Sequence, residues 1–364
     1  MKIKDILRVL EQWAPLSLQE NYDNCGLLVG SPEMEVESAL LTLDVTEAVI
    51  DEAVKHNHKF IIAHHPIVFK GIKTLTGRNY VERVLIKAVK NDIAIYAIHT
   101  NLDNVQTGVN HRISRLLGLE NCKVLVPKHG LLKLLRVYVP KDSTEALFNA
   151  LFEAGAGAIG NYDLCGFSLS GQGSFRPNDR ANPSIGQNNV KEIVDEHLVE
   201  VIFEQWKTQN VLEAMRNAHP YEEVAHQIVT IDNLLQTAGS GMVGNMPVAM
   251  PEAEFLSTLK EKMGAKIIRH TALLGKKVSK VALCGGSGSF LLEDAIRAGA
   301  DVYISGDFTY HRFFDAEGKI VIADIGHYES EQFTPALIKD FLKEKMPTFA
   351  PQLSKVDTNP INYF

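Results

Sequence analysis

The chain has 364 residues, more than one small domain needs, so we expect two domains or one domain with a large insertion. A hydrophobic fraction of 45% and a charged fraction of 22% are typical of a globular protein with a real core. Lys and Arg number 37 against 44 Asp and Glu, and this net charge of −7 gives no reason to expect binding to nucleic acid or to an anionic membrane surface.

The first part of the sequence alternates helical and extended patterns. In residues 3–13, apolar side chains recur at helical spacing, and further helix-like stretches cover residues 46–56 and 80–91. Short apolar runs read as buried strands at Ala39–Val45, Phe60–Ala63, Ile93–Ile98, Val281–Cys284, Val302–Ile304 and Ile320–Ala323. This alternation predicts an α/β domain of three layers, with one mainly parallel sheet covered on both faces.

Residues 129–237 have a different pattern. We predict a strand at Leu134–Val139, a helix at Ser143–Ala154, a strand within a Gly-, Asn- and Pro-rich stretch, a strand at His197–Phe203, a helix at Asn210–Asn217 and a strand at Glu223–Ile231. The order β-α-β-β-α-β is that of a ferredoxin-like, split β-α-β module. Because candidate ligands lie on both sides of it, we interpret 129–237 as an insertion into one α/β domain formed by residues 1–128 and 238–364.

Polar side chains follow four of the predicted strands. The strands lead into His64-His65-Pro66, into His99 and Asp103, into Asp307 and His311, and into His327. The carboxyl ends of parallel strands meet at the edge of a sheet where α/β proteins place their ligands. Core packing alone does not require this pattern, so it indicates a functional site.

Five of these residues form a candidate metal site. His64 and His65 are adjacent, and neighbouring side chains in an extended segment point to opposite sides, so the pair can serve two nearby ions, or one ion and a bound ligand. Asp103 offers a carboxylate that can bridge two cations. His327 and Glu331 are spaced i, i+4 and would share one face of a helix that begins after Gly326.

Each of these residues has a commoner role when it is taken alone. One histidine in a polar loop is usually just hydrogen-bonded, Asp103 could cap a helix over residues 107–117, and His327 with Glu331 could be a solvated helix face. Together, three imidazoles and two carboxylates predict two divalent metal ions, and this ligand set suits Zn, Fe, Mn or Co. Two ions about 3.5–4 Å apart would activate a bridging water.

Further residues are candidates for supporting roles. His99 and His311 could transfer protons, and Asp307 could orient a ligand, although each could also be an ordinary satisfied polar group. Asp44 has the same ambiguity. The segment Gly285–Ser289 could bind phosphate through backbone N–H groups, but a tight turn between a strand and a helix explains it equally well.

Cysteine usage and hydropathy indicate the cellular location of the protein. Four cysteines, with no CxxC spacing, read as reduced thiols: Cys25, Cys122, Cys165 and Cys284. The N-terminal segment has no uninterrupted apolar run, and no stretch approaches the ~18 apolar residues that span a bilayer. We therefore expect a cytoplasmic protein that does not enter a membrane.

Several segments resemble the Nif-three-like family, whose members are also named GTP cyclohydrolase 1 type 2 homologs. The resemblance rests on Tyr22–Gly30, the His64-His65-Pro66 turn, His99–Asp103, Ser305–His311 and Gly326–Glu331. The middle segment is similar to the PII/CutA-like domain inserted in the longer bacterial members, at Ala154–Asp163 and His219–Glu223. Tyr22 stands where many relatives carry Trp, which is an exchange of one aromatic residue for another.

The resemblance implies a dinuclear metal centre at His64, His65, Asp103, His327 and Glu331, and a toroidal homohexamer with the sites facing an internal cavity. It also implies a hydrolase that attacks C8 of a guanine ring and releases formate. Our preferred hypothesis is a metal-dependent hydrolase of a nucleotide-like or other phosphorylated small molecule. The alternative is a non-catalytic metal-binding or regulatory protein, with a role in metal trafficking or in ligand sensing by the inserted domain.

Overall fold

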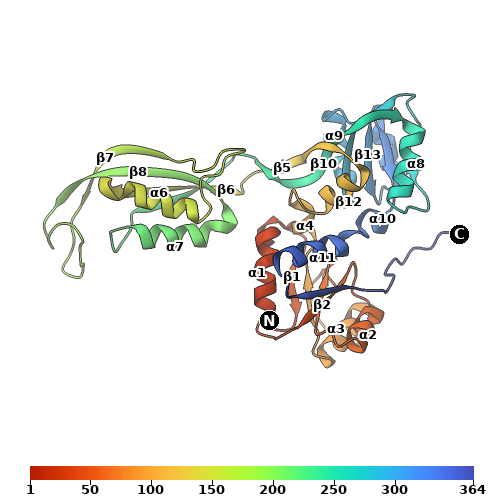
Figure 1. Ribbon diagram of the computed structural model, residues 1–364, viewed down its shortest axis with the longest axis horizontal. Coiled ribbons are helices and arrows are strands. Elements are labelled where there is room, and N and C mark those ends of the chain that lie inside the picture. The colour runs from red at the N-terminus through yellow and green to blue at the C-terminus, as the bar shows by residue number, and fades with distance from the viewer. The chain divides into compact units, whose positions relative to one another are not determined.

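The computed structural model describes residues 1–364, which form two compact units. Unit 1 consists of Met1–Pro127 together with Thr237–Phe364, and unit 2 is the continuous segment Lys128–Gln236. Figure 1 shows both, with the chain coloured from its N-terminus to its C-terminus. Unit 1 is therefore discontinuous in sequence, since the whole of unit 2 lies between its two segments.

The helices of unit 1 are α1 (Ile3–Trp13), α2 (Glu47–Lys55), α3 (Tyr80–Lys90), α4 (Thr100–Asn104), α5 (Val109–Leu117), α8 (Glu252–Lys262), α9 (Leu292–Arg297), α10 (His327–Glu331) and α11 (Thr334–Lys345). Its strands are β1 (Gly26–Val29), β2 (Ser38–Thr42), β3 (Phe60–Ala63), β4 (Ala94–Ala97), β5 (Glu120–Lys128), β10 (Leu235–Pro251), β11 (Arg269–His270), β12 (Lys277–Ser287), β13 (Val302–Gly306), β14 (Val321–Asp324) and β15 (Ala350–Leu353). No helix of the chain combines the length and the apolar character needed to cross a membrane.

One sheet of unit 1 has five strands in the order β1-β4-β3-β2-β15. The last four strands in this order are parallel, and β1 runs antiparallel to β4. Every residue of β3 and β4 is buried, as expected for strands covered on both faces. Because Ala63 pairs with Ala97, the segments that follow β3 and β4 leave the sheet side by side.

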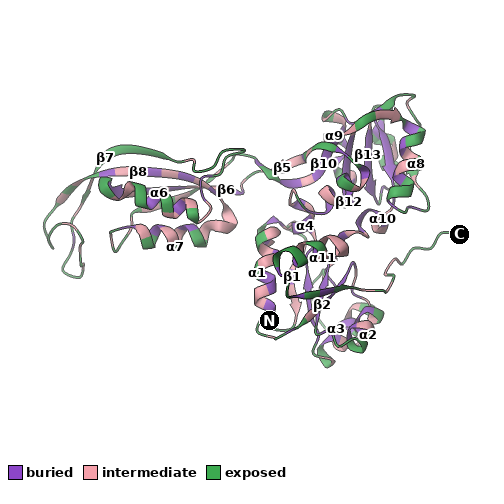
Figure 2. Ribbon diagram, in the orientation of Figure 1, coloured by how far each residue is buried: buried purple, intermediate pink, exposed green.

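The other sheet of unit 1 has six strands in the order β11-β14-β13-β12-β10-β5. Strands β12, β13 and β14 are parallel, whereas β10 and β11 pair antiparallel with their neighbours. Ser305 pairs with Asp324, so the segments after β13 and β14 also lie next to each other. Figure 2 shows the buried central strands of both sheets in purple.

The α/β class expected from the sequence is confirmed, but the prediction of one sheet in a three-layer domain was wrong. The predicted strands divide between two sheets, since β2, β3 and β4 belong to one and β12, β13 and β14 to the other. A single apolar core joins them: it contains residues from both sheets and from α1, α5, α8 and α11. Buried strands of this kind must be covered on both faces. Two sheets that share helices meet this need, and so does one sheet between two layers of helices, so the apolar pattern of the strands fits both arrangements.

Unit 2 is a four-stranded antiparallel sheet with two helices. Its elements are β6 (Leu132–Pro140), α6 (Thr144–Glu153), β7 (Phe167–Phe175), β8 (Glu192–Glu204), α7 (Thr208–Ala218) and β9 (His226–Ile231). The strand order is β7-β8-β6-β9, and each neighbouring pair is antiparallel. Residues of α6 and α7 share one apolar core with β6 and β8, so both helices cover the same face of this sheet.

Candidate metal centre

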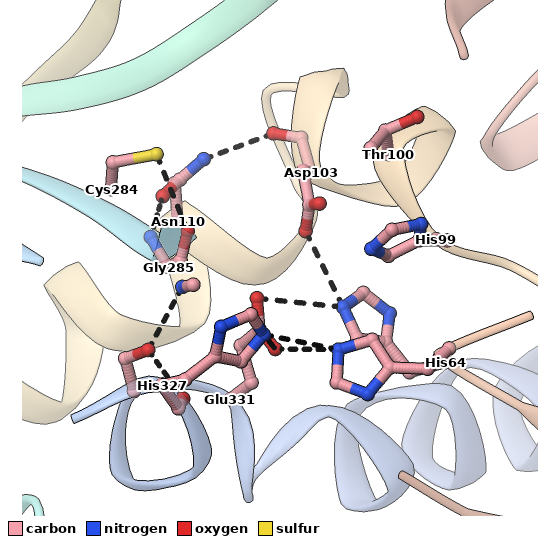
Figure 3. Close-up of polar contacts among 12 residues, drawn as sticks. His64, His99, Thr100, Asp103, Asn110, Cys284, Gly285, His327 and Glu331 are labelled. Atoms are coloured by element: carbon pink, nitrogen blue, oxygen red, sulfur yellow. Dashed lines mark hydrogen bonds and ion pairs between the residues drawn. The ribbon is translucent and has the colours of Figure 1, made fainter. Parts of the chain in front are cut away.

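Side chains from both sheets of unit 1 meet in one cluster (Figure 3). His64 and His65 directly follow β3, and Asp103 lies on the short helix α4 that follows β4. His327 and Glu331 are the first and last residues of α10, which begins shortly after β14. Gly326, with φ +94°, makes the turn from this strand into α10, a conformation that favours glycine.

The ligand atoms of this cluster form three overlapping groups, and within each group they lie no more than 4.8 Å apart. The groups are His64, Asp103 and Glu331; His65, His327 and Glu331; and His64, His65 and His99. The two oxygens of Glu331 face different histidines. Oε1 is 3.8 Å from His64 Nε2, whereas Oε2 is 3.0 Å from the Nε2 atoms of both His65 and His327.

Each histidine of the cluster is oriented by an acceptor at its Nδ1 atom. His64 Nδ1 is 2.8 Å from the Ile98 carbonyl oxygen, His65 Nδ1 is 2.7 Å from Asp44 Oδ1, and His327 Nδ1 is 2.7 Å from Asp307 Oδ2. An Nδ1–H group that donates to such an acceptor leaves Nε2 free to bind a metal ion. Metal-binding histidines in proteins are held in this way by carboxylates and carbonyls.

Two buried polar atoms in the cluster lack a partner. His64 Nε2 and Asp103 Oδ1 are buried without any hydrogen bond, and 3.7 Å separates them. Leaving a buried donor or acceptor unsatisfied costs about 1–3 kcal/mol, so such atoms need an explanation. A cation bound between the imidazole nitrogen and the carboxylate oxygen would satisfy both, and the residues present therefore fit a metal ion.

The carboxylates of the cluster raise the pKa values of two of its histidines. Burial alone would lower the pKa of His65, but hydrogen bonds to Asp44 and Glu331 outweigh it and raise this pKa to about 10. His327 behaves in the same way, because Asp307 and Glu331 raise its pKa to about 11 against the effect of burial. Burial and the charge of Glu331 raise the pKa of Asp103 well above its ordinary value. The cluster thus concentrates negative charge that a cation can neutralise.

The glycine-rich segment after β12 shapes the space around Glu331. The N–H groups of Gly285, Gly286 and Gly288 donate to Asn110 Oδ1, Ser330 Oγ and Ser305 Oγ. These three donors are used within the protein, which favours a tight turn over a phosphate-binding loop. A Cβ atom on Gly286 would lie 2.3 Å from Glu331 Oε1, and the lack of a side chain there leaves room for this carboxylate.

His99 belongs to a second hydrogen-bonded arrangement beside the cluster. Its Nδ1 atom is 2.9 Å from Asp23 Oδ1, and Asp23 Oδ2 accepts hydrogen bonds from the Thr100 backbone N–H and hydroxyl groups. Burial opposes ionisation of Asp23, but the hydrogen bonds with His99 and Thr100 outweigh it and lower the pKa of Asp23. The carboxylate therefore stays ionised and fixes the ring of His99.

The cluster opens into a cavity of about 360 Å³. His65, His99, Asp103, His327 and Glu331 line it, and so do three largely exposed aromatic side chains, Tyr22, Phe69 and Phe290. No lysine or arginine is among its lining residues. Positive charge that faces a ligand in this cavity would therefore come from protonated histidines or from bound metal.

Comparison with known proteins identifies the family of the chain. The family model of Duf34/NIF3 (NGG1p interacting factor 3) matches residues 1–360. The chain belongs to the Duf34/NIF3 family. Proteins named GTP cyclohydrolase 1 type 2 homolog from Halalkalibacterium halodurans and Bacillus subtilis are each 36% identical to it, and the alignments cover 98% or more of both chains. The crystal structure of a Bacillus cereus protein related to NIF3 aligns with a TM-score of 0.87 at 35% identity, covering 100% of this chain and 99% of the other.

Most of the site residues expected from the sequence of this Duf34/NIF3 chain come together in the structure. His64, His65, Asp103, His327 and Glu331 all lie in the cluster, with His99 beside them. His311 does not. It lies on the 3-10 helix η5 (Tyr310–Ala316), is exposed, packs against the rings of Tyr310 and Phe314, and does not line the cavity.

Asp23 is a residue that reasoning from the sequence missed. The only signal for it was its place in the segment Tyr22–Gly30, on which the family resemblance rests, because no local pattern links it to His99. Asp44 and Asp307, in contrast, were possible orienting residues, and the structure places both against histidines of the cluster.

Proposed function

We propose that unit 1 binds two divalent metal ions per chain through His64, His65, Asp103, His327 and Glu331. The observation that carries this proposal is Glu331, whose two carboxylate oxygens face separate histidines and can therefore bridge two ions. Cys284 also lines the cavity, but none of the three groups of clustered ligand atoms includes its thiol. The remaining nitrogen and oxygen donors suit Zn, Fe, Mn or Co.

We further propose that the chain is a hydrolase that depends on these ions. When bound, a pair of such ions makes water a stronger nucleophile and stabilises negative charge on a substrate oxygen. His99 supplies the proton transfer. With its Nδ1–H donated to Asp23, the Nε2 atom of His99 is free to accept a proton from water and to return it to the leaving group. His311 has no place in this step because it lies away from the cavity.

The substrate that we propose is a nucleotide-like or other phosphorylated small molecule. Tyr22 and Phe69 have ring centroids 6.2 Å apart at the cavity, and Phe290 adds a third exposed ring. Exposed aromatic side chains around a polar site favour a ligand with a flat ring, because stacking contributes about 1–3 kcal/mol for a nucleic-acid base. The relatives named GTP cyclohydrolase 1 type 2 homolog support the same class of ligand.

The second candidate is a metal-binding or regulatory protein without turnover. It is favoured by unit 2, which has a large cavity of its own. From its strand order, we infer that unit 2 is a ferredoxin-like module of the PII/CutA kind, inserted into the metal-binding domain. The homohexamer and the cytoplasmic location expected from the sequence stay predictions.

Turnover assays with defined metals distinguish these candidates. The chain would be freed of metal with a chelator, loaded separately with Mn, Zn, Fe or Co, and assayed on GTP for released formate and on a panel of nucleotides and phosphoesters. We expect turnover that is lost in His64→Ala and Asp103→Ala and kept in His311→Ala. Stoichiometric metal binding with no turnover on the whole panel would contradict the hydrolase and support the second candidate.

A further inference from the structure

Unit 2 contains a cavity of about 1010 Å³ that has no part in the metal centre. All of its lining residues belong to unit 2, and they come from β6 (Tyr138), from β7, from the loop that follows β7, from β8 and from residues 221–225. Its apolar wall includes Leu169, Phe175, Pro177, Ile185 and Leu198. Pockets that hold small organic ligands range from about 300 to 1,000 Å³, so this cavity is large enough for one.

A buried carboxylate lies at the cavity. Glu196 on β8 exposes only 7% of its surface, and its Oε1 atom accepts a hydrogen bond of 2.9 Å from the hydroxyl of Tyr221. Its other oxygen, Oε2, has no hydrogen-bond partner in the chain, although it remains open to the cavity. A carboxylate oxygen that accepts no hydrogen bond within the chain and faces a cavity can accept one from a bound ligand.

Gly173 on the neighbouring strand β7 leaves room for this oxygen. A Cβ atom on Gly173 would lie 1.9 Å from Glu196 Oε2, so the carboxylate occupies space that any other residue type would fill. Strand β7 lies at the edge of the sheet, with Gly171 paired to Glu196. The close approach of the Glu196 side chain thus explains why a glycine is needed at position 173.

Tyr221 is also held in place before any ligand binds. Its ring packs between those of Phe175 and His219, at centroid distances of 5.7 and 5.1 Å. His219 accepts the Tyr221 backbone N–H at Nδ1 and donates from Nε2 to the Tyr138 carbonyl oxygen. Glu196 and Tyr221 therefore form a preorganised pair, and preorganised groups bind a ligand at a lower entropic cost.

Positive charge lies elsewhere in the same cavity, on the loop of residues 176–190. Arg176 and Arg180 line the cavity, are exposed, and form no ion pair within the chain. The loop is closed by a hydrogen bond from Asn189 N–H to the Pro177 carbonyl oxygen, and Asn182 N–H ties it to Glu222 Oε1. A ligand would thus meet an acceptor at Glu196 and unpaired guanidinium groups at the loop.

We propose that this cavity binds a small molecule that carries a flat pair of N–H donors at one end and an anionic group at the other. Glu196, with Tyr221 beside it, would accept the N–H pair, and Arg176 or Arg180 would bind the anion. Carboxylates pair well with two parallel N–H groups, and arginine pairs well with carboxylate or phosphate. Two common molecules share this chemistry: a guanine nucleotide and the amino acid arginine.

Isothermal titration calorimetry on the full chain, with unit 1 free of metal, tests the proposal and separates the two sources. GMP would be compared with IMP, which lacks the second N–H group, and arginine with norleucine, which lacks the donors altogether. In one of the two pairs, we expect the first probe to bind and its partner to bind at least about tenfold more weakly. GMP selected over IMP assigns the site to a nucleotide, and arginine selected over norleucine assigns it to an amino acid.

Variants locate the binding. Glu196→Gln should weaken it at least about tenfold, and Tyr221→Phe, which removes one hydroxyl group, by a smaller factor. Glu200→Gln is the matched control, because Glu200 lies on the same strand but does not line the cavity. If Glu196→Gln fails to fold, Tyr221→Phe decides the outcome.

Three results would overturn the proposal: no binding of any probe, equal binding within each pair, or binding that persists in Glu196→Gln and Tyr221→Phe but disappears in His65→Ala. The last result would place the ligand at the metal centre. Since the cavity lies wholly in unit 2, the hydrolase proposed for unit 1 can fail without affecting this one.

Discussion

His65 Nε2 and Glu331 Oε2 lie 3.0 Å apart, although 266 positions separate the two residues in the chain. One follows a strand of the five-stranded sheet, and the other ends a helix that follows a strand of the six-stranded sheet. This contact joins the candidate ligands that follow the five-stranded sheet to those on α10. A substitution in one set should therefore change metal binding by the other.

Elemental analysis of single variants tests the bridging role of Glu331. We expect Glu331→Ala to lose both metal ions, because its two oxygens serve both histidine groups, whereas His327→Ala should keep one ion near His64 and Asp103. His311→Ala is the control and should retain the wild-type metal content. Equal metal content in Glu331→Ala and wild type would show that the carboxylate does not bridge.

A methyl group at Gly286 should disturb the same carboxylate. In Gly286→Ala the new Cβ atom would lie 2.3 Å from Glu331 Oε1, so Glu331 must move and metal affinity should fall at least about tenfold. Gly275→Ala is a matched control, because Gly275 has a similar φ of +72° but no atom within 4 Å of the added Cβ. Equal metal binding by the two variants would mean that backbone strain, and not Glu331, explains any loss.

Loss of the Asp23 carboxylate should affect turnover more than metal content. Asp23→Asn keeps the shape of the side chain but removes the negative charge that holds the His99 ring, so we expect turnover to fall about 10- to 100-fold. Metal content should stay at the wild-type level. Asp51→Asn, an exposed residue paired with Lys87, is the control and should change neither quantity.

Metal binding should release protons. In the metal-free chain the pKa values of His65 and His327 are about 10 and about 11, so both rings are protonated at pH 7 and must lose a proton to bind a metal. We expect calorimetry in buffers of different ionisation enthalpy to detect at least two released protons, since the raised pKa of Asp103 can add a third, and metal affinity to weaken as the pH falls. Affinity that does not change between pH 8 and pH 6 would contradict this expectation.

Glu82 should stabilise the loop that precedes α3 in a pH-dependent way. Its carboxylate accepts hydrogen bonds from the Thr76 backbone N–H and hydroxyl and from the Arg78 backbone N–H, which lower its pKa to about 2. A lowered pKa in the folded state stabilises the protein above the unfolded-state value of about 4.3 and loses that effect as the pH falls to about 2.

Urea unfolding checks the role of Glu82. The wild type should unfold at higher urea than Glu82→Gln at pH 7, and the difference should shrink from pH 5 to pH 2. Glu47→Gln, which removes one exposed ion pair with Arg83, should have little effect. A difference between wild type and Glu82→Gln that stays constant with pH would rule out the ionised carboxylate as the cause.

Local structure was predictable from the sequence, but the assembly of the strands was not. Phe60–Ala63 is β3 as expected, and residues 3–13 form α1, because apolar spacing reports which face of an element is buried. The division into two sheets depends on pairings such as Leu353 with Leu41, which join distant parts of the chain. Apolar spacing carries no information about such partners.

The same distinction holds for the site. His64 and His65 were predictable because two histidines at the end of a buried strand are unusual, and Glu331 because of its i, i+4 spacing from His327. Asp23 was not, since its contact with His99 spans 76 positions. The proton-transfer role expected for His311 stays a prediction, although this exposed residue of η5 does not line the cavity.

The position of unit 2 within the sequence has a consequence for the synthesis of the protein. A ribosome finishes His64, His65 and Asp103 long before His327 and Glu331, and the whole of Lys128–Gln236 is made in between. The parallel strand β15, which pairs with β2, follows later still. The proposed ligand set is therefore incomplete until the C-terminal part of the chain has been made, so binding of both proposed ions would require the finished chain.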